Sequence, residues 1–430
     1  MRRSHIIRIV VLTIVLLSII NCKVGISGDE KEYYYKLRMS FINNGSNDYF
    51  LTLEDKLFTV FPNTSVQQVY IVEANPSVER TLRDEDGNLF AELNLPETIR
   101  PGENITVTIL MKINLISRSL PQVSIDSSGT LFDIPVELVN YTTSSGAWKY
   151  ENEDLKYIAE LAAHIRGNDT NVLRIICEMV EFIGSRVEYP SGEELRPPQY
   201  PSQTLPSPGE RGEGDCDDQS TLLITMLRSI GIPAYLQTGG VLSTDYSLNG
   251  NTWDGHLTIS SRGIGWHGWV EAYIPPWGWL PVDITYGYYP QRQNPLSSIK
   301  YSASATEHVL ESEKYSNMDF VAESLRTEER IKRSSLYLHV EEEVYTRSLF
   351  DNNLNWGEPL KKSIILLILL LTILVIVLAT LYLLERRAYL KGFNNVRIEI
   401  LRLTIPDNLD VEMQHKLRVT NLKTSDISLN

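Results

Sequence analysis

The stretch GDCDDQSTLLITMLRSIGIPAYL, residues 214–236, places a cysteine before an apolar helix and a strand after it. Gly231 stands where a glycine commonly follows a helix end, and residues 232–236 have strand character. The apolar residues at helical spacing are Leu222, Leu223, Met226, Leu227 and Ile230. This order predicts a helix packed on a sheet, with Cys216 at the helix start.

Two further helices are expected before this stretch, at DLKYIAELAAHIRG (154–167) and NVLRIICEMVEFIG (171–184). Asp169 or Thr170 is the candidate cap of the second helix, and Gly184 its candidate stop. The strands expected after the third helix are IPAYLQ (232–237), HLTIS (256–260), WVEAYI (269–274) and WLPVDITY (279–286). Helices followed by antiparallel strands predict an α+β domain over 150–300.

The loop SGEELRPPQYPSQTLPSPGERGEG, residues 191–214, precedes the cysteine and has no periodicity. A loop this long within a domain is usually functional or disordered. Upstream, residues 30–145 are predicted to form an antiparallel β-sandwich with a structural or adhesive role. The strand candidates are YYYKLRMSFI (33–42), FTVF (58–61), QQVYIVEA (67–74), LFAELNL (89–95), ITVTILMKINL (105–115) and PVELVNY (135–141).

Both ends of the chain carry apolar segments. Residues 363–384 hold 22 residues without a charge, which at 1.5 Å per residue is enough to span a bilayer core of about 30 Å. Basic residues after this segment place the tail 385–430 in the cytoplasm. Residues 1–29 predict a signal peptide or an uncleaved N-terminal anchor, which would give two passes. Residues 301–360 are then a membrane-proximal extension, and everything from 30 to 360 faces outward.

Charge excludes one class of partner. The net charge is −14, but residues 1–23 and 361–430 each carry +4, so the large middle segment carries −22. A surface this acidic repels phosphates, so we expect no nucleic-acid binding. The expected partners are a protein or peptide substrate outside the membrane and the lipid bilayer around the C-terminal helix.

Cys216 is the candidate nucleophile. The positive end of a helix stabilises a thiolate and lowers the pKa of the thiol, whereas Asp217 and Asp218 act in the opposite direction. His267 in WHGWVEAYI and Asp283 in WGWLPVD lie on strands joined by a short turn. A four-residue turn would set position 286 opposite His267, so a bulge or a shifted turn is needed for Asp283 to orient the imidazole.

Alternative roles are open to several of these residues. Cys177 lies in an apolar helical phase, which predicts a buried free thiol. A metal site would need Cys216, Asp217, Asp218, His256 and His267, whose spacing matches no structural zinc pattern, so neither a metal nor a cofactor is expected. Five tryptophans lie around the hairpin, at 253, 266, 269, 277 and 279; core packing is their expected role, with a groove lining as the alternative.

The ordered motifs resemble the core of the transglutaminase-like superfamily, which has a papain-type fold. They are GDCDDQSTLLITMLRSIGIPAYLQTGGV and HGWVEAYIPPWGWLPVDITYG, with ELAAHIRGND and VEFIGSRVEYP before them and QTL at 203–205. Residues 32–142 bear a weaker resemblance to the sandwich that often precedes such domains.

The resemblance implies that Cys216 is the nucleophile, His267 the acid and base, and Asp283 the orienting carboxylate. The reaction would be attack on an amide to form a thioester, followed by transfer of the acyl group to water or to an amine. An oxyanion hole is required, with the Cys216 N–H as one donor and no second donor identified from the sequence. The alternative is a catalytically silent surface or adhesion module that retains the fold.

Overall fold

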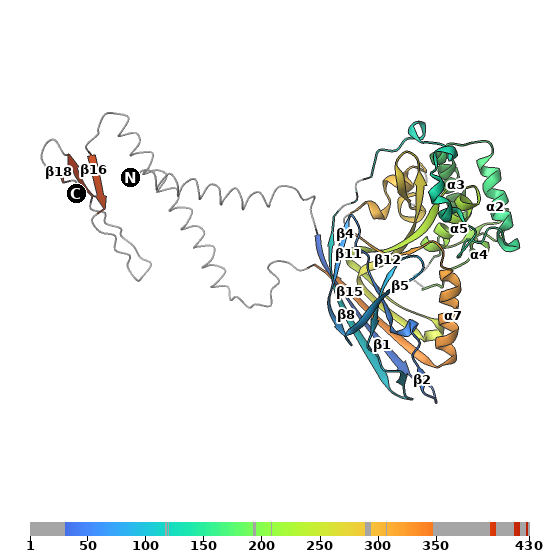
Figure 1. Ribbon diagram of the computed structural model, residues 1–430, viewed down its shortest axis with the longest axis horizontal. Coiled ribbons are helices and arrows are strands. Elements are labelled where there is room, and N and C mark those ends of the chain that lie inside the picture. The colour runs from blue at the N-terminus through green and yellow to red at the C-terminus, as the bar shows by residue number, and fades with distance from the viewer. Residues whose placement is uncertain are drawn as a thin grey trace. The chain divides into compact units, whose positions relative to one another are not determined.

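A mixed sheet runs through the first of the two compact units into which the chain divides (Figure 1). The computed structural model describes residues 31–346, except 117, 119, 192–194, 208, 289–293 and 307, and the short segments 396–400, 417–421 and 427–428. In pairing order, the sheet contains β14 (Val309–Tyr315), β11 (Ala234–Thr252), β12 (Leu257–Ile274), β15 (Leu336–Tyr345), β1 (Lys31–Asn43), β8 (Asn104–Leu115) and β4 (Gln67–Asn75), and β13 (Gly278–Val282) also pairs with β12. β12 and β15 pair in parallel, and the other pairs are antiparallel.

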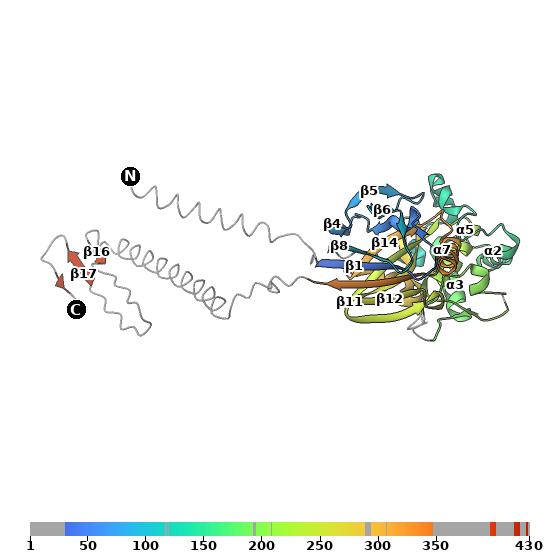
Figure 2. The ribbon, with the colours of Figure 1, turned by 90° about the horizontal axis from the view of Figure 1, so that it is seen from below.

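A smaller sheet packs on the N-terminal part of this sheet, as Figure 2 shows for β5 and β6. The smaller elements are β3 (Leu57–Val60), β6 (Leu89–Leu93) and β5 (Val78–Arg83), with the pair β2 (Tyr49–Phe50) and β7 (Thr98–Ile99) and the turn η1 (Glu54–Lys56). Phe58 and Leu93 from this layer share a buried core with Val107 and Met111 of β8 and with Ile264 of β12. The two layers are therefore joined by burial of apolar surface.

The connection after β8 differs from the prediction. The strand predicted at 135–141 is wrong, because Val136–Thr142 forms the 3₁₀ helix η4, after η2 (Ile125–Ser127) and η3 (Leu131–Asp133). Val136 and Val139 are exposed, so the apolar alternation there does not reflect a buried strand face.

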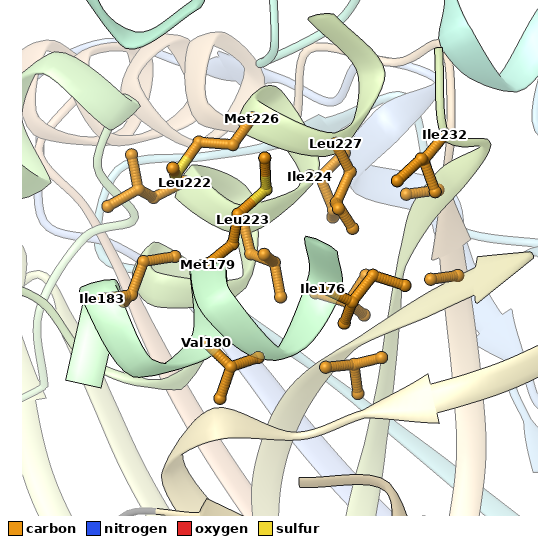
Figure 3. Packing of buried hydrophobic residues seen from close by; sticks show 14 of the residues in the cluster. Ile176, Met179, Val180, Ile183, Leu222, Leu223, Ile224, Met226, Leu227 and Ile232 are labelled. Carbon is orange, nitrogen blue, oxygen red and sulfur yellow. The ribbon is translucent and has the colours of Figure 1, made fainter. Parts of the chain in front are cut away.

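Three helices pack against β11, β12 and β13 in the second core. They are α2 (Glu153–Arg166), α3 (Val172–Arg186) and α5 (Cys216–Ser229), and Figure 3 shows apolar side chains of α3 meeting those of α5. The side chain of Asn171, rather than of Asp169 or Thr170, caps α3 by accepting from Arg174 N. Gly184 lies inside α3 and does not end it.

The strands predicted at 256–260 and 269–274 are parts of one long strand, β12, which follows the turn η5 (Trp253–Gly255). β13 ends at Val282, and the chain then makes one helical turn, η6 (Ile284–Tyr288). Within the described part of the predicted 191–214 loop lie α4 (Pro201–Thr204) and β10 (Gly212–Glu213), which pairs with β9 (Val187–Glu188).

Residues after 296 return to the same sheet. They form α6 (Ser297–Lys300), η7 (Ala303–Ala305), β14, α7 (Phe320–Arg333) and β15. Because β15 pairs with both β1 and β12, the segments predicted separately as 30–145, 150–300 and 301–360 all contribute strands to one sheet. The boundary expected at residue 300 does not interrupt it.

The second unit contributes β16 (Val396–Ile400), β17 (Leu417–Asn421) and β18 (Ile427–Ser428), which pair in that order. Among the helices of the described residues, none is long and apolar enough to cross a membrane. The predicted leader at 1–29 and the predicted span at 363–384 lie outside the described residues.

Candidate active site

Cys216 is the first residue of α5, with Asp215 as its N-cap. The hydroxyl of Ser220 donates to the Cys216 carbonyl oxygen at 2.7 Å and lies 3.3 Å from the Gly268 carbonyl oxygen. The backbone N–H of Gly268 is also hydrogen-bonded to the Cys216 sulfur. These contacts hold the thiol against β12, beside the residue that follows His267.

His267 and Asp283 form a direct contact, as predicted. Nε2 of His267 lies 3.0 Å from Oδ2 of Asp283, and the Asp283 side chain is fully buried. Two backbone N–H groups also bind this carboxylate, from Ala303 at 3.0 Å and from Tyr286 at 2.9 Å. Donation from Nε2 to the carboxylate leaves Nδ1 of His267 as the nitrogen available to a thiol.

The turn between β12 and β13 explains how Asp283 reaches His267. Ile274 pairs with Gly278, so three residues connect the strands rather than the four expected. Continuing this register sets Asp283 opposite Trp269, and side chains two apart on a strand share a face. Asp283 is therefore the diagonal neighbour of His267, whereas a one-residue shift would turn it to the other face.

The pKa of Cys216 lies well above its usual value, mainly because the thiol is desolvated. The charges of Asp217 and Asp215 raise it further, and Oδ1 of Asp217 lies 3.9 Å from the sulfur. The hydrogen bond from Gly268 N–H acts in the opposite direction. The expectation that the helix start lowers this pKa is wrong, because burial and acidic neighbours outweigh the favourable N–H groups.

Asp218 is a site residue whose role the sequence did not reveal. Its side chain accepts from the backbone N–H of Gln199 at 2.8 Å and of Asp215 at 3.2 Å. These bonds fix the loop before α4 to the start of α5. Burial and the charge of Asp215 raise the pKa of Asp218 to about 7, and the same causes raise the pKa of Asp217 well above its usual range.

A cleft of about 580 Å³ contains both Cys216 and His267. Its other lining residues include Tyr189, Leu195, Arg196, Pro198, Asp217, Tyr246, Leu248, Ile259, Ser261, Ile264 and Trp266. The walls are mostly apolar and aromatic, with the acidic groups gathered beside the thiol. Such a surface can bury an apolar group of a ligand.

The five tryptophans around the hairpin divide into two groups. Trp269 is fully buried, and Trp253, Trp277 and Trp279 pack against apolar or aromatic neighbours. Trp266 alone among these five lines the cleft, and it is 43% exposed. Four of these tryptophans therefore pack in the core, and one lines the cleft.

His256 is not part of the group of possible metal ligands at the start of α5. Its Nδ1 is 2.7 Å from the Leu336 carbonyl oxygen, and its ring stacks on Tyr337. Within the described residues, Asp215, Cys216 and Asp217 place possible ligand atoms within 4.8 Å of one another. These three residues are consecutive at one helix start.

Glu271 in the HGWVE motif anchors the segment that precedes the helices. Its buried carboxylate accepts from Arg118 Nη1 at 2.5 Å and Nη2 at 2.9 Å. The indole N–H of Trp269 donates to the same carboxylate at 3.1 Å. This bidentate buried ion pair fixes the connection between β8 and the helices to β12, the strand that carries His267.

Asp217→Asn should move the pH midpoint of Cys216 alkylation to lower pH, because it removes a charge that raises the thiol pKa. While the thiol is mostly protonated, each unit of decrease raises the thiolate fraction about tenfold. Iodoacetamide labelling followed by peptide mass spectrometry measures the profile.

Buried Cys177, whose pKa burial raises to about 12, is the internal control, and the exposed Asp126→Asn is the matched substitution. An unchanged or higher midpoint in Asp217→Asn would show that this carboxylate does not govern the thiol.

Comparison with known proteins identifies the domain that carries this site. Residues 159–284 match the model of the transglutaminase-like superfamily. The uncharacterized protein YebA of Bacillus subtilis (strain 168) is 27% identical over 168 residues, which make up 38% of this chain and 22% of that protein. The chain thus matches less than a quarter of that relative's length.

Solved structures give weaker likenesses. A proposed cysteine protease from Cytophaga hutchinsonii is 15% identical with a TM-score of 0.44, covering 75% of this chain and 93% of that one. The periplasmic domain of TgpA from Pseudomonas aeruginosa is 16% identical with a TM-score of 0.29, covering 62% and 94%. The family match includes Cys216, His267 and Asp283, and residues 159–284 are therefore a transglutaminase-like domain.

Proposed function

We propose that this protein is a thiol-dependent amide hydrolase or acyltransferase that acts on proteins or peptides through a thioester on Cys216. The observation that carries the proposal is the buried Asp283 carboxylate bound to the histidine that shares the cleft with the cysteine. Backbone donors alone could satisfy a carboxylate with only a structural role, so such a carboxylate would not require an imidazole that lines a cleft. This arrangement is the one required to orient a general base.

The site residues can carry out each step of acyl transfer from an amide. Nδ1 of His267 takes the thiol proton as the sulfur attacks the amide carbonyl carbon, and Asp283 stabilises the imidazolium. The backbone N–H of Cys216 is a donor for the oxyanion. His267 then returns the proton to the leaving amine as the C–N bond breaks, which leaves the thioester. Water or a second amine attacks the thioester with His267 again as the base, and the thiol is restored.

A catalytically silent surface module is the second candidate, and the raised pKa of Cys216 is the observation that favours it. A mostly protonated thiol is a poor nucleophile unless a base accepts its proton. The enzyme proposal therefore depends on coupling between His267 and the thiol. A silent module needs no such coupling.

Asp283→Asn separates the two candidates by the direction of a shift. The Asp283 charge by itself raises the pKa of Cys216, so without coupling its removal lowers the alkylation midpoint. If a thiolate–imidazolium pair forms, loss of the carboxylate destabilises the imidazolium and the midpoint rises. The enzyme proposal predicts the rise, measured by the pH profile of iodoacetamide labelling.

His267→Gln is the second variant for this experiment, because it leaves Asp283 its two backbone donors. It should shift the midpoint upward as Asp283→Asn does, with folding checked by circular dichroism. A lower midpoint in Asp283→Asn together with an unchanged midpoint in His267→Gln would leave the silent module as the better account.

We also propose that residues 30–360 lie outside the cell membrane, with a helix at 363–384 and the tail 385–430 in the cytoplasm. The apolar run and the charge distribution support this. Protease added outside intact cells should digest the 30–360 region and spare an epitope placed after Asn430. Digestion of that epitope would contradict the proposed orientation.

A further inference from the structure

Trp266 forms an open aromatic wall beside the catalytic histidine. It immediately precedes His267 on β12, and its surface, 43% of which is exposed, borders both the cleft and a second cavity. A large exposed ring is unusual, because tryptophan normally buries most of its surface. Held rigidly, such a ring can bind a side chain at little cost in conformational entropy.

A buried carboxylate holds this ring in place. The indole N–H of Trp266 donates to Oε2 of Glu342 at 2.9 Å. Glu342 lies on β15 and is 8% exposed, and its carboxylate also accepts from Tyr35 at 2.7 Å and from Ser261 at 2.7 Å. Three neutral donors around one buried carboxylate define its position, and this position fixes the direction of the indole N–H.

The ring of Trp266 also contacts residues outside the transglutaminase-like domain, with which it borders a second cavity of about 440 Å³. The ring of Trp266 lies 6.2 Å from that of Phe61, and Phe61 packs edge-on against Tyr35 at 4.9 Å. Phe61, Tyr35 and Glu342 all fall outside residues 159–284. The flanking strands therefore determine the shape of a cleft whose chemistry belongs to the domain between them.

We infer that Trp266 is a specificity-determining residue that selects substrates with a bulky apolar side chain next to the reacting amide, and that Glu342 is its positioning residue. This inference rests on the proposed function and names the substrate class of that site. The apolar lining of the cleft complements such a side chain, and the acidic groups beside the thiol disfavour an acidic one.

Two peptide chloromethyl ketones that differ only in phenylalanine or glycine next to the ketone test the inference on the full-length protein. The Cys216 sulfur displaces chloride, so the rate of labelling by each reagent needs no natural substrate. We expect the phenylalanine reagent to react about 10- to 100-fold faster, the range expected for burying one large apolar side chain. In Trp266→Ala this ratio should fall to about 1 to 3.

Glu342→Gln should lower the ratio several-fold, whereas Glu341→Gln, the neighbouring exposed residue on the same strand, should leave it unchanged. Trp266→Phe keeps a ring but lacks the N–H, so adding Glu342→Gln to it should have no further effect on the ratio. An additive effect in the double variant would show that Glu342 does not act through the indole.

Failure of the inference and failure of the proposed function give different results. A wild-type ratio near 1, or a ratio retained in Trp266→Ala, would overturn the inference while labelling still depends on His267. Labelling by both reagents that is unchanged in His267→Gln would contradict the proposed function itself.

Discussion

The buried carboxylate of Asp283 is the constraint on which the site depends. A charge withdrawn from water must be satisfied by donors, and here these come from three separate segments: β12, the turn after β13, and η7. Because the donors converge on one carboxylate, the His267 ring, the end of the hairpin and the return of the chain toward β14 are fixed together. Contacts between the start of α5 and Gly268 hold the thiol beside the residue that follows His267.

The acidic residues around Cys216 have a structural and an electrostatic effect that oppose each other. Asp218 binds the loop at Gln199 to the helix start, and so shapes the cleft. Desolvation raises the pKa of the thiol most, and the charges of Asp217 and Asp215 beside it raise it further. A thiol with such a raised pKa reacts only where a base is positioned to accept its proton. Activation of Cys216 therefore depends on His267.

Much of the site could be predicted because its signals are local. The helix period places Cys216 at the start of α5, and the ordered motifs identify His267 and Asp283. The hairpin register could not be predicted, because IPPWG accommodates a turn of either three or four residues, and only one keeps Asp283 on the face of His267. The thiol pKa depends on burial, which sequence does not give. The roles of Glu342 and Arg118 rest on contacts with residues 76 and 153 positions away, beyond the reach of any local pattern.

The central claim is that Cys216 forms an acyl thioester with His267 as its base. The most direct measurement is acid-quenched mass spectrometry of the full-length protein mixed with a peptide p-nitrophenyl ester. The account predicts an acyl adduct on the peptide that contains Cys216, absent in Cys216→Ser and formed at least about 100-fold more slowly in His267→Gln. An adduct on another residue, or one that forms at the same rate without His267, would contradict it.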